Sequence, residues 1–172
     1  MKKAMQSAAF WQHKSLAQMT TEEWEALCDG CGKCCLHKLI DAAPPSDPLD
    51  NNDGLYMSAT DELHYTDVRC AYLDPESGQC QCYGERLQKV ATCVEITLAD
   101  LPRIHFMPTS CAYRRLHEGR GLPDWHPLLH GGSQAAMLAA RQSVVNYPTI
   151  SERELAEQDF ELRIVSWPLH EV

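Results

Sequence analysis

The stretch CDGCGKCC at positions 28–35 decides how the rest of the sequence is interpreted, because it places four thiols within eight residues. Two-residue gaps separate its first three cysteines, so a chain that wraps around a metal can bring successive sulfurs to one centre. Gly30 and Gly32 permit the backbone angles that this wrapping needs, and free amides can hydrogen-bond to the sulfurs. The stretch therefore predicts a metal site.

Five more cysteines follow, which makes nine in 172 residues, and an odd number cannot pair completely within one chain. In a reducing compartment, clustered cysteines serve metal binding or redox chemistry. The predicted metal ligands are a local group and a remote group: Cys28, Cys31, Cys34 and Cys35, then Cys70, Cys80, Cys82, Cys111 and Cys93. Cys93 and Cys111 have apolar neighbours in the sequence, so the alternative for each is a buried free cysteine that binds no metal. Cys93 is the weakest ligand candidate of the nine.

Two kinds of inorganic centre fit these thiols. Zinc takes closed tetrahedral sites, and eight thiolates would complete two of them. An iron–sulfur cluster also takes four thiolates, and the gaps within 28–34 equal those of the first three ligands in a bacterial ferredoxin loop. The next cysteine and the proline of that loop are absent, and the adjacent Cys34 and Cys35 belong to neither pattern. The sequence leaves iron–sulfur and zinc open.

Thiol chemistry without a metal is the competing class. A Cys-x-x-Cys pair can cycle between dithiol and disulfide, and Lys33 could lower the pKa of one thiol. No βαβ pattern surrounds the pair, and no cysteine–histidine pair for nucleophilic catalysis can be singled out. His37 and His126 are possible substitute ligands, although a hydrogen-bonded or solvated histidine is favoured for each. The alternative function is a thiol-redox or metal-dependent enzyme, or an accessory factor, that acts on a protein partner.

A β-hairpin is expected to carry the remote group. Residues 63–73 alternate as a strand does, residues 75–78 form a turn, and residues 79–83 return as the second strand. A loop over residues 74–78 would place Cys70 opposite Cys82 and Tyr72 opposite Cys80. All four would share one face, with the opposed Cβ atoms about 4.5–5.5 Å apart.

The remaining pattern predicts a small α+β domain, with much irregular structure organised around the metal centre. Thr20 and Glu23 form a capping box before a short helix that Gly30 and Gly32 stop. Other expected elements are a helical turn at 97–101, a helix within 108–116, a strand at 143–147 and a helix that opens at a second capping box, Ser151 to Glu154, and runs to about residue 162. The single domain spans residues 1–172, with an N-terminal arm (1–19), a surface loop (41–54), and a C-terminal helix and tail (151–172).

The charge balance of 15 basic and 24 acidic residues, a net −9, limits the partners. An acidic surface repels phosphate, so we expect neither nucleic-acid binding nor membrane binding through a basic face. No apolar run approaches the roughly 20 residues of a membrane span, and polar residues interrupt the apolar region that a signal peptide would need after Lys3. We expect a cytoplasmic protein, and the sequence leaves open whether it has a protein partner.

Several segments together resemble the bacterial YcgN-like branch of the CxxCxxCC cysteine-cluster family. They are CDGCGKCCLHKL (28–39), YTDVRC (65–70), CQCY (80–83), TSCAYRRLHEG (109–119) and LPDWHPLL (122–129). The resemblance implies a zinc- or iron-chelating protein that uses the 28–35 group and four of the five later cysteines, and the branch shares the ninth. The resemblance implies a metal-chelating site but no particular reaction. The predicted function is a cytosolic metal-binding protein that holds an iron–sulfur cluster, zinc or both.

Overall fold

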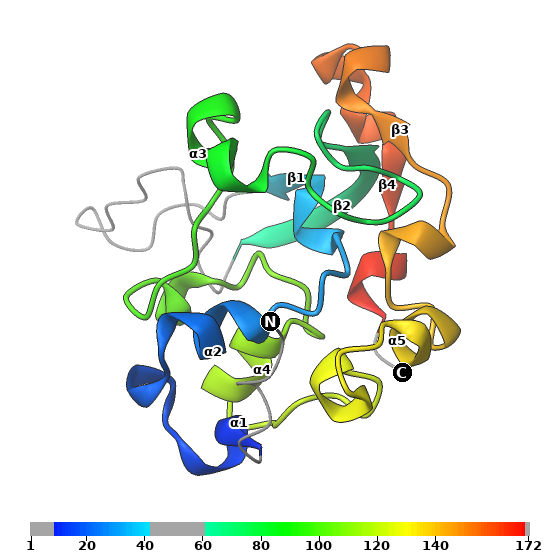
Figure 1. The fold of residues 1–172 in the computed structure, drawn as a ribbon. Helices are drawn as coiled ribbons and strands as arrows, with labels where there is room; N and C mark the ends of the chain where they lie inside the picture. Colours follow the sequence, from blue (N-terminus) through cyan, green and yellow to red (C-terminus); the bar gives the residue numbers. More distant parts are fainter. Residues whose placement is uncertain (1–8, 42–60, 171–172) are drawn as a thin grey trace, which may run out of the picture.

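A small sheet begins directly after the cysteine stretch. The computed structural model describes residues 9–41 and 61–170. Within them, β1 (Leu36–Asp41) pairs antiparallel with β2 (Glu62–Arg69), and the other edge of β2 pairs with β3 (Ile150–Ser151) and β4 (Ile164–Val165). Figure 1 shows this sheet on one side of the helical N-terminal part. Apart from Asp41, the predicted surface loop at 41–54 lies outside the described residues.

Short helices and 3-10 turns supply most of the remaining structure, so the predicted α+β class is confirmed. The α-helices are α1 (Phe10–His13), α2 (Thr21–Ala26), α3 (Arg86–Lys89), α4 (Ala112–His117) and α5 (Ala135–Ala139). The 3-10 turns are Leu16–Gln18, Lys33–Cys35, Tyr83–Glu85, Leu101–Arg103, Pro127–His130, Val144–Asn146, Glu152–Glu154, Glu157–Arg163 and Trp167–Leu169. None of the helices in residues 9–41 and 61–170 has the length and apolar character that crossing a bilayer requires.

The predicted capping box of α2 is present. The Glu23 amide donates to Thr20 Oγ1 at 3.3 Å, and the Thr20 amide donates to Glu23 Oε2 at 2.9 Å. These bonds satisfy amides that a helix start leaves without partners. The capping box thus fixes where α2 begins; the helix ends at Ala26, and Cys28 follows its C-cap residue, Leu27.

Three apolar clusters meet around the cysteine stretch and hold it at three points. Leu27 lies in the largest cluster, beside residues of α1, α4 and the 101–107 segment. Cys31 packs with Trp125 and Met137 in a second cluster. Leu36 packs with Tyr65, Leu73 and Val144 in a third. Because these anchors are buried in different parts of the core, the intervening loop has little freedom to move as a whole.

Two expected elements differ from the sequence prediction. Residues 143–147 form a 3-10 turn, Val144–Asn146, instead of a strand, because the Ser143 side chain caps it and accepts from the Val145 amide. The capping box at Ser151 is present, but the backbone turns extended at Leu155 and Ala156. The expected helix is therefore two 3-10 segments, and the chain then returns to the sheet as β4.

Candidate metal centre

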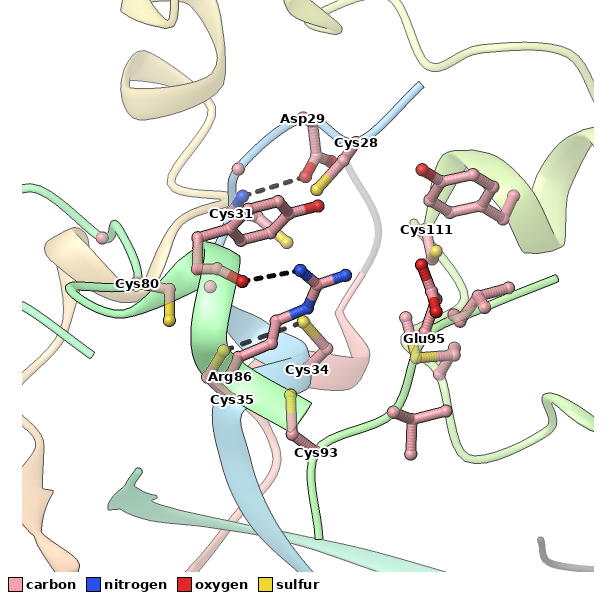
Figure 2. A pocket seen from close by; sticks show the side chains of 18 of the residues that line it. Cys28, Asp29, Cys31, Cys34, Cys35, Cys80, Arg86, Cys93, Glu95 and Cys111 are labelled. Atoms are coloured by element: carbon pink, nitrogen blue, oxygen red, sulfur yellow. Dashed lines mark hydrogen bonds between the residues drawn. The ribbon is translucent and has the colours of Figure 1, made fainter. Parts of the chain in front are cut away.

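Eight of the nine cysteines line one cavity of about 200 Å³. They are Cys28, Cys31, Cys34, Cys35, Cys70, Cys80, Cys93 and Cys111. Figure 2 shows labelled thiols arriving from several separate segments. The local group comes from the loop between α2 and β1, and the remote cysteines come from the end of β2, the following turn, the segment after α3 and the start of α4. The fold thus brings both predicted groups to one place.

The loop that carries the local cysteines is held by hydrogen bonds from a distant part of the chain. The Cys31 carbonyl accepts from the Val144 amide at 2.9 Å and from Ser143 Oγ at 3.3 Å. Gln134 Nε2 donates to the Asp29 carbonyl at 3.1 Å. Sequence reasoning did not connect residues 134–144 with the site, because no periodicity or motif links them to it.

Gly32 has a left-handed backbone with φ of 74° and no room for a side chain. A Cβ there would lie 2.7 Å from Val144 Cγ2 and 3.3 Å from the Gly78 carbonyl oxygen. Gly121 has nearly the same φ, 71°, but nothing lies within 4 Å of its Cβ position. Gly121 therefore provides a control with the same backbone strain and no steric contact.

We expect Gly32→Ala to destabilise the chain more than Gly121→Ala does. Backbone strain costs each variant about 1–2 kcal/mol, and overpacking against Val144 adds about 1–3 kcal/mol to Gly32→Ala alone. Urea unfolding of the two variants measures the difference. Equal losses of stability would show that the loop can move away from Val144.

Two lysines accompany the local thiols. Lys33 is fully buried, and its Nζ donates to Gln142 Oε1 at 2.7 Å and to Ser110 Oγ at 3.2 Å. Lys38 Nζ donates to the carbonyls of Cys34 and Leu36, both at 2.8 Å. Their positive charges offset the negative charge that thiolate ligands bring into a protein interior.

The thiols differ in pKa. A hydrogen bond from Cys35, whose sulfur lies 4.0 Å away, lowers the pKa of Cys34 to about 7, and the Lys38 charge assists. Burial raises the pKa of Cys111 to about 12, and burial also raises the pKa values of Cys28 and Cys31. A metal ion that binds thiolates here must therefore displace protons.

The stability of the metal-free chain is expected to fall as pH rises above 9. Cys111 has an ordinary pKa of 9.0 and a folded pKa of about 12, so between these values the unfolded chain releases a proton that the folded chain keeps. The loss is about 1.4 kcal/mol for each pH unit and each such thiol. Urea unfolding after metal removal, below and above pH 9, measures it. A metal-free stability that rises through this range would contradict the burial of Cys111 as a thiol.

The strand register expected for the hairpin is wrong by one residue. The Gln81 amide donates to the Tyr72 carbonyl, and Leu73, not Tyr72, lies opposite Cys80. The returning segment makes only this isolated bridge before a 3-10 turn begins at Tyr83. Cys82 is the one cysteine of the nine that does not line the cavity. Its sulfur nevertheless lies 3.9 Å from that of Cys80.

Neither candidate histidine lies on the cavity. His126 is fully buried, with Nε2 3.0 Å from the Leu27 carbonyl oxygen and Nδ1 accepting from the Leu128 amide at 3.1 Å. His37 Nε2 pairs with Glu152 Oε2. Both histidines are thus hydrogen-bonded within the protein, as the sequence favoured.

Several polar or charged side chains in the cavity wall were missed from the sequence, among them Asp29, Tyr83, Arg86 and Glu95. The Arg86 guanidinium lies 3.9 Å from the Tyr83 ring centre and donates to the Tyr83 carbonyl at 2.7 Å. Burial raises the pKa of Cys93, and the Arg86 charge opposes that rise. No spacing rule links residues 83–95 to the local cysteines, so only the fold reveals them.

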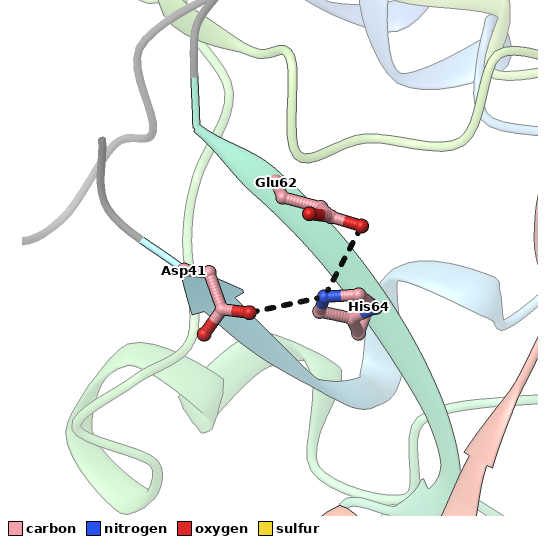
Figure 3. Close-up of side chains that lie close together, drawn as sticks. All are labelled: Asp41, Glu62 and His64. Atoms are coloured by element: carbon pink, nitrogen blue, oxygen red, sulfur yellow. Dashed lines mark hydrogen bonds and ion pairs between the residues drawn. The ribbon is translucent and has the colours of Figure 1, made fainter.

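A separate group of ligand-type side chains lies at the far end of the sheet (Figure 3). His64 Nε2 is 3.3 Å from Asp41 Oδ2 and 3.7 Å from Glu62 Oε1. Asp41 and Glu62 are opposite each other on β1 and β2, and both are exposed. Ion pairing of His64 with Asp41 across the strands and with Glu62 on its own strand accounts for this group.

Comparison with known proteins shows that the segment carrying the cysteines matches a known sequence family. Residues 27–112, which contain all nine cysteines, match the sequence model of the CxxCxxCC family, described as "Putative zinc- or iron-chelating domain". A UPF0260 protein of Shewanella pealeana is 46% identical over 164 residues, covering 95% of this chain and 99% of the relative. UPF0260 proteins of Shewanella sediminis and Shewanella oneidensis are each 43% identical over 164 residues with the same coverage. No solved structure gave a significant match.

Proposed function

The chain belongs to the CxxCxxCC family, together with the UPF0260 proteins, and we propose that it is a cytoplasmic metal-binding protein whose cavity holds an iron–sulfur cluster. Cysteine thiolates from both groups are the ligands. The family description allows zinc or iron, so the choice of an iron–sulfur cluster is the specific part of the proposal.

The spacing of the thiols carries this choice. A tetrahedral zinc site with bonds of about 2.3 Å holds its sulfurs about 3.8 Å apart. The described residues include every cysteine. Among them, one group of three ligand-type side chains has its donor atoms all within 4.8 Å of one another, and it consists of Asp41, Glu62 and His64, with no cysteine. Two thiol pairs, Cys34–Cys35 and Cys80–Cys82, lie about as close as zinc needs, at 4.0 and 3.9 Å, but no third thiol joins either pair, which favours a centre larger than a single ion. An iron–sulfur cluster has several irons and sulfides between its cysteine ligands, and it is a centre of this kind.

Thiol redox chemistry is a second candidate, and the Cys34–Cys35 pair favours it. The pKa of Cys34 is lowered to about 7 through its hydrogen bond with Cys35, and Cys34 is exposed. A thiolate that is accessible near neutral pH is a nucleophile. Alkylation before and after metal removal separates the candidates: a ligand at Cys34 reacts only after the metal is removed, whereas a redox thiol reacts in both states.

Metal analysis of protein purified without oxygen tests the main proposal. We expect iron and acid-labile sulfide in similar amounts, and a brown protein with a broad visible absorption band. Colourless protein with stoichiometric zinc and no sulfide would contradict the cluster while leaving metal binding intact. Protein with neither metal, prepared in the same way, would contradict metal binding itself.

A further inference from the structure

Asp29 has an oxygen atom whose position in the core is not explained by the protein alone. The residue is 6% exposed, and its Oδ1 accepts from the Cys31 amide at 2.9 Å. Its Oδ2 is the one side-chain nitrogen or oxygen atom in the described residues that is buried without a hydrogen-bond partner. Burying a carboxylate oxygen without a partner is unfavourable by about 1–3 kcal/mol or more, so such an atom indicates a missing partner.

The carboxylate lies in the wall of the cysteine cavity. Asp29 lines it between Cys28 and Cys31, and Figure 2 shows the side chain beside the labelled thiols. Burial raises the pKa values of Cys28, Cys31 and Cys111, and the Asp29 charge adds to each rise. A negative charge among buried thiols would be repelled by their thiolates, unless a cation lies between them.

His126, whose pKa the Asp29 charge affects, does not supply the missing partner. The Asp29 charge acts on His126, but both ring nitrogens of His126 are engaged, one with the Leu27 carbonyl and the other with the Leu128 amide. The bond from the Cys31 amide to Oδ1 also fixes the carboxylate relative to the loop. Oδ2 is therefore left without a protein partner in a residue that lines the cysteine cavity.

We propose that Asp29 is itself a ligand of the metal centre, with Oδ2 supplying one oxygen donor among the thiolates. The inference rests on the proposed function, since it requires a metal in the cavity. Carboxylate oxygen binds both iron and zinc. In an otherwise thiolate set it is the harder and more readily displaced donor. The metal atom at Asp29 is then the position at which an external ligand can bind.

X-ray absorption at the metal edge tests this assignment in the full-length, metal-loaded chain. Carboxylate oxygen lies about 2.0–2.2 Å from such a metal and thiolate sulfur about 2.3 Å, so an oxygen ligand adds a shorter shell whose amplitude reports the fraction of metal atoms that carry it. In Asp29→Asn, Oδ1 can still accept from the Cys31 amide, but Oδ2 becomes an amide nitrogen that donates and does not bind metal. Asp67→Asn is the matched control, because Asp67 is 9% exposed, pairs with Arg163 and does not line the cavity.

We expect an oxygen shell in the wild type and in Asp67→Asn, and its loss in Asp29→Asn. Release of metal to a chelator should be at least tenfold faster from Asp29→Asn than from Asp67→Asn. Asp29→Cys, which exchanges the donor for another thiolate, should keep the metal with a sulfur-only shell, and it decides the question if Asp29→Asn does not fold.

Two results would overturn the inference. A sulfur-only shell in the wild type would show that Asp29 does not reach the metal. An oxygen shell that survives in Asp29→Asn or in Asp29→Cys would assign the oxygen to water or another residue. Absence of metal from the wild type would instead reject the proposed function, and the edge energy separates iron from zinc, so the two failures are distinguishable.

Discussion

Replacement of Cys31 by serine is expected to abolish metal binding and to destabilise the whole chain. Cys31 is 8% exposed, lines the cavity and packs with Trp125 and Met137. A serine hydroxyl stays protonated at neutral pH, so it does not replace a thiolate. Serine is close in size to cysteine, so the fall in stability should come mainly from the lost metal. Metal content after desalting and a thermal melt measure the two effects.

Cys82→Ser is the matched control for this substitution. Cys82 is 7% exposed, comparable with Cys31, but it does not line the cavity. We expect it to retain nearly all of the metal. Cys93 lines the cavity and Cys82 does not. Cys82, and no longer Cys93, is therefore the cysteine that we expect to contribute least to metal binding. Full metal content in Cys31→Ser, or its loss in Cys82→Ser alone, would contradict this assignment.

Removal of the metal from the wild-type chain is expected to lower its melting temperature by about 8–16 °C. A ligand present at a thousand times its Kd stabilises the folded state by about 4 kcal/mol, and a chain of this length gains about 2–4 °C for each kcal/mol. Among the helices, strands and turns, α3 packs mainly on the 3-10 turn Tyr83–Glu85 just before it, so a metal in the cavity would add a link between these segments and the cysteine loop. These segments should loosen first when the metal is lost.

A chelator titration followed by a thermal melt measures the effect, and the metal remaining on the protein is determined in the same sample. Readdition of the metal should restore the original melt. An unchanged melting temperature after verified metal removal would show that the three apolar clusters hold the fold without the metal.

Local chemistry made part of the site predictable. The capping box before α2, the left-handed glycines of the loop and the helix after Pro108 depend on residues that are close in sequence. Each satisfies backbone groups or backbone angles on its own, whatever the rest of the chain does. The position of the local cysteines at a helix end therefore follows from the sequence.

The register of the remote cysteines depended on one turn that the pattern did not resolve. Asp74 accepts from Ser77 Oγ at 2.6 Å and from the Glu76 amide at 3.1 Å, and its own amide donates to the Gln79 carbonyl. The side chain thus closes a turn over residues 75–78, one residue shorter than expected. That single residue brought Leu73 opposite Cys80, where Tyr72 was expected.

Long-range contacts account for the remaining differences. The bonds from residues 134–144 to the cysteine loop, and the burial of Asp29, arise because segments more than 100 residues apart pack together. No local pattern encodes which polar side chain meets which carbonyl across such a separation. The residues expected to tune the metal centre are therefore visible only in the folded chain.

The most direct measurement is the iron content of a Cys70→Ser, Cys111→Ser double variant, purified without oxygen beside the wild type and Cys82→Ser. Both replaced cysteines line the cavity and belong to the remote group, whereas the local group is left whole. If both groups bind one centre, the double variant should keep less than about a tenth of the wild-type iron, as expected when ligands of a shared site are lost, while Cys82→Ser keeps nearly all of it. Retention of half the iron or more in the double variant would show that residues 28–35 bind a complete centre without the remote cysteines.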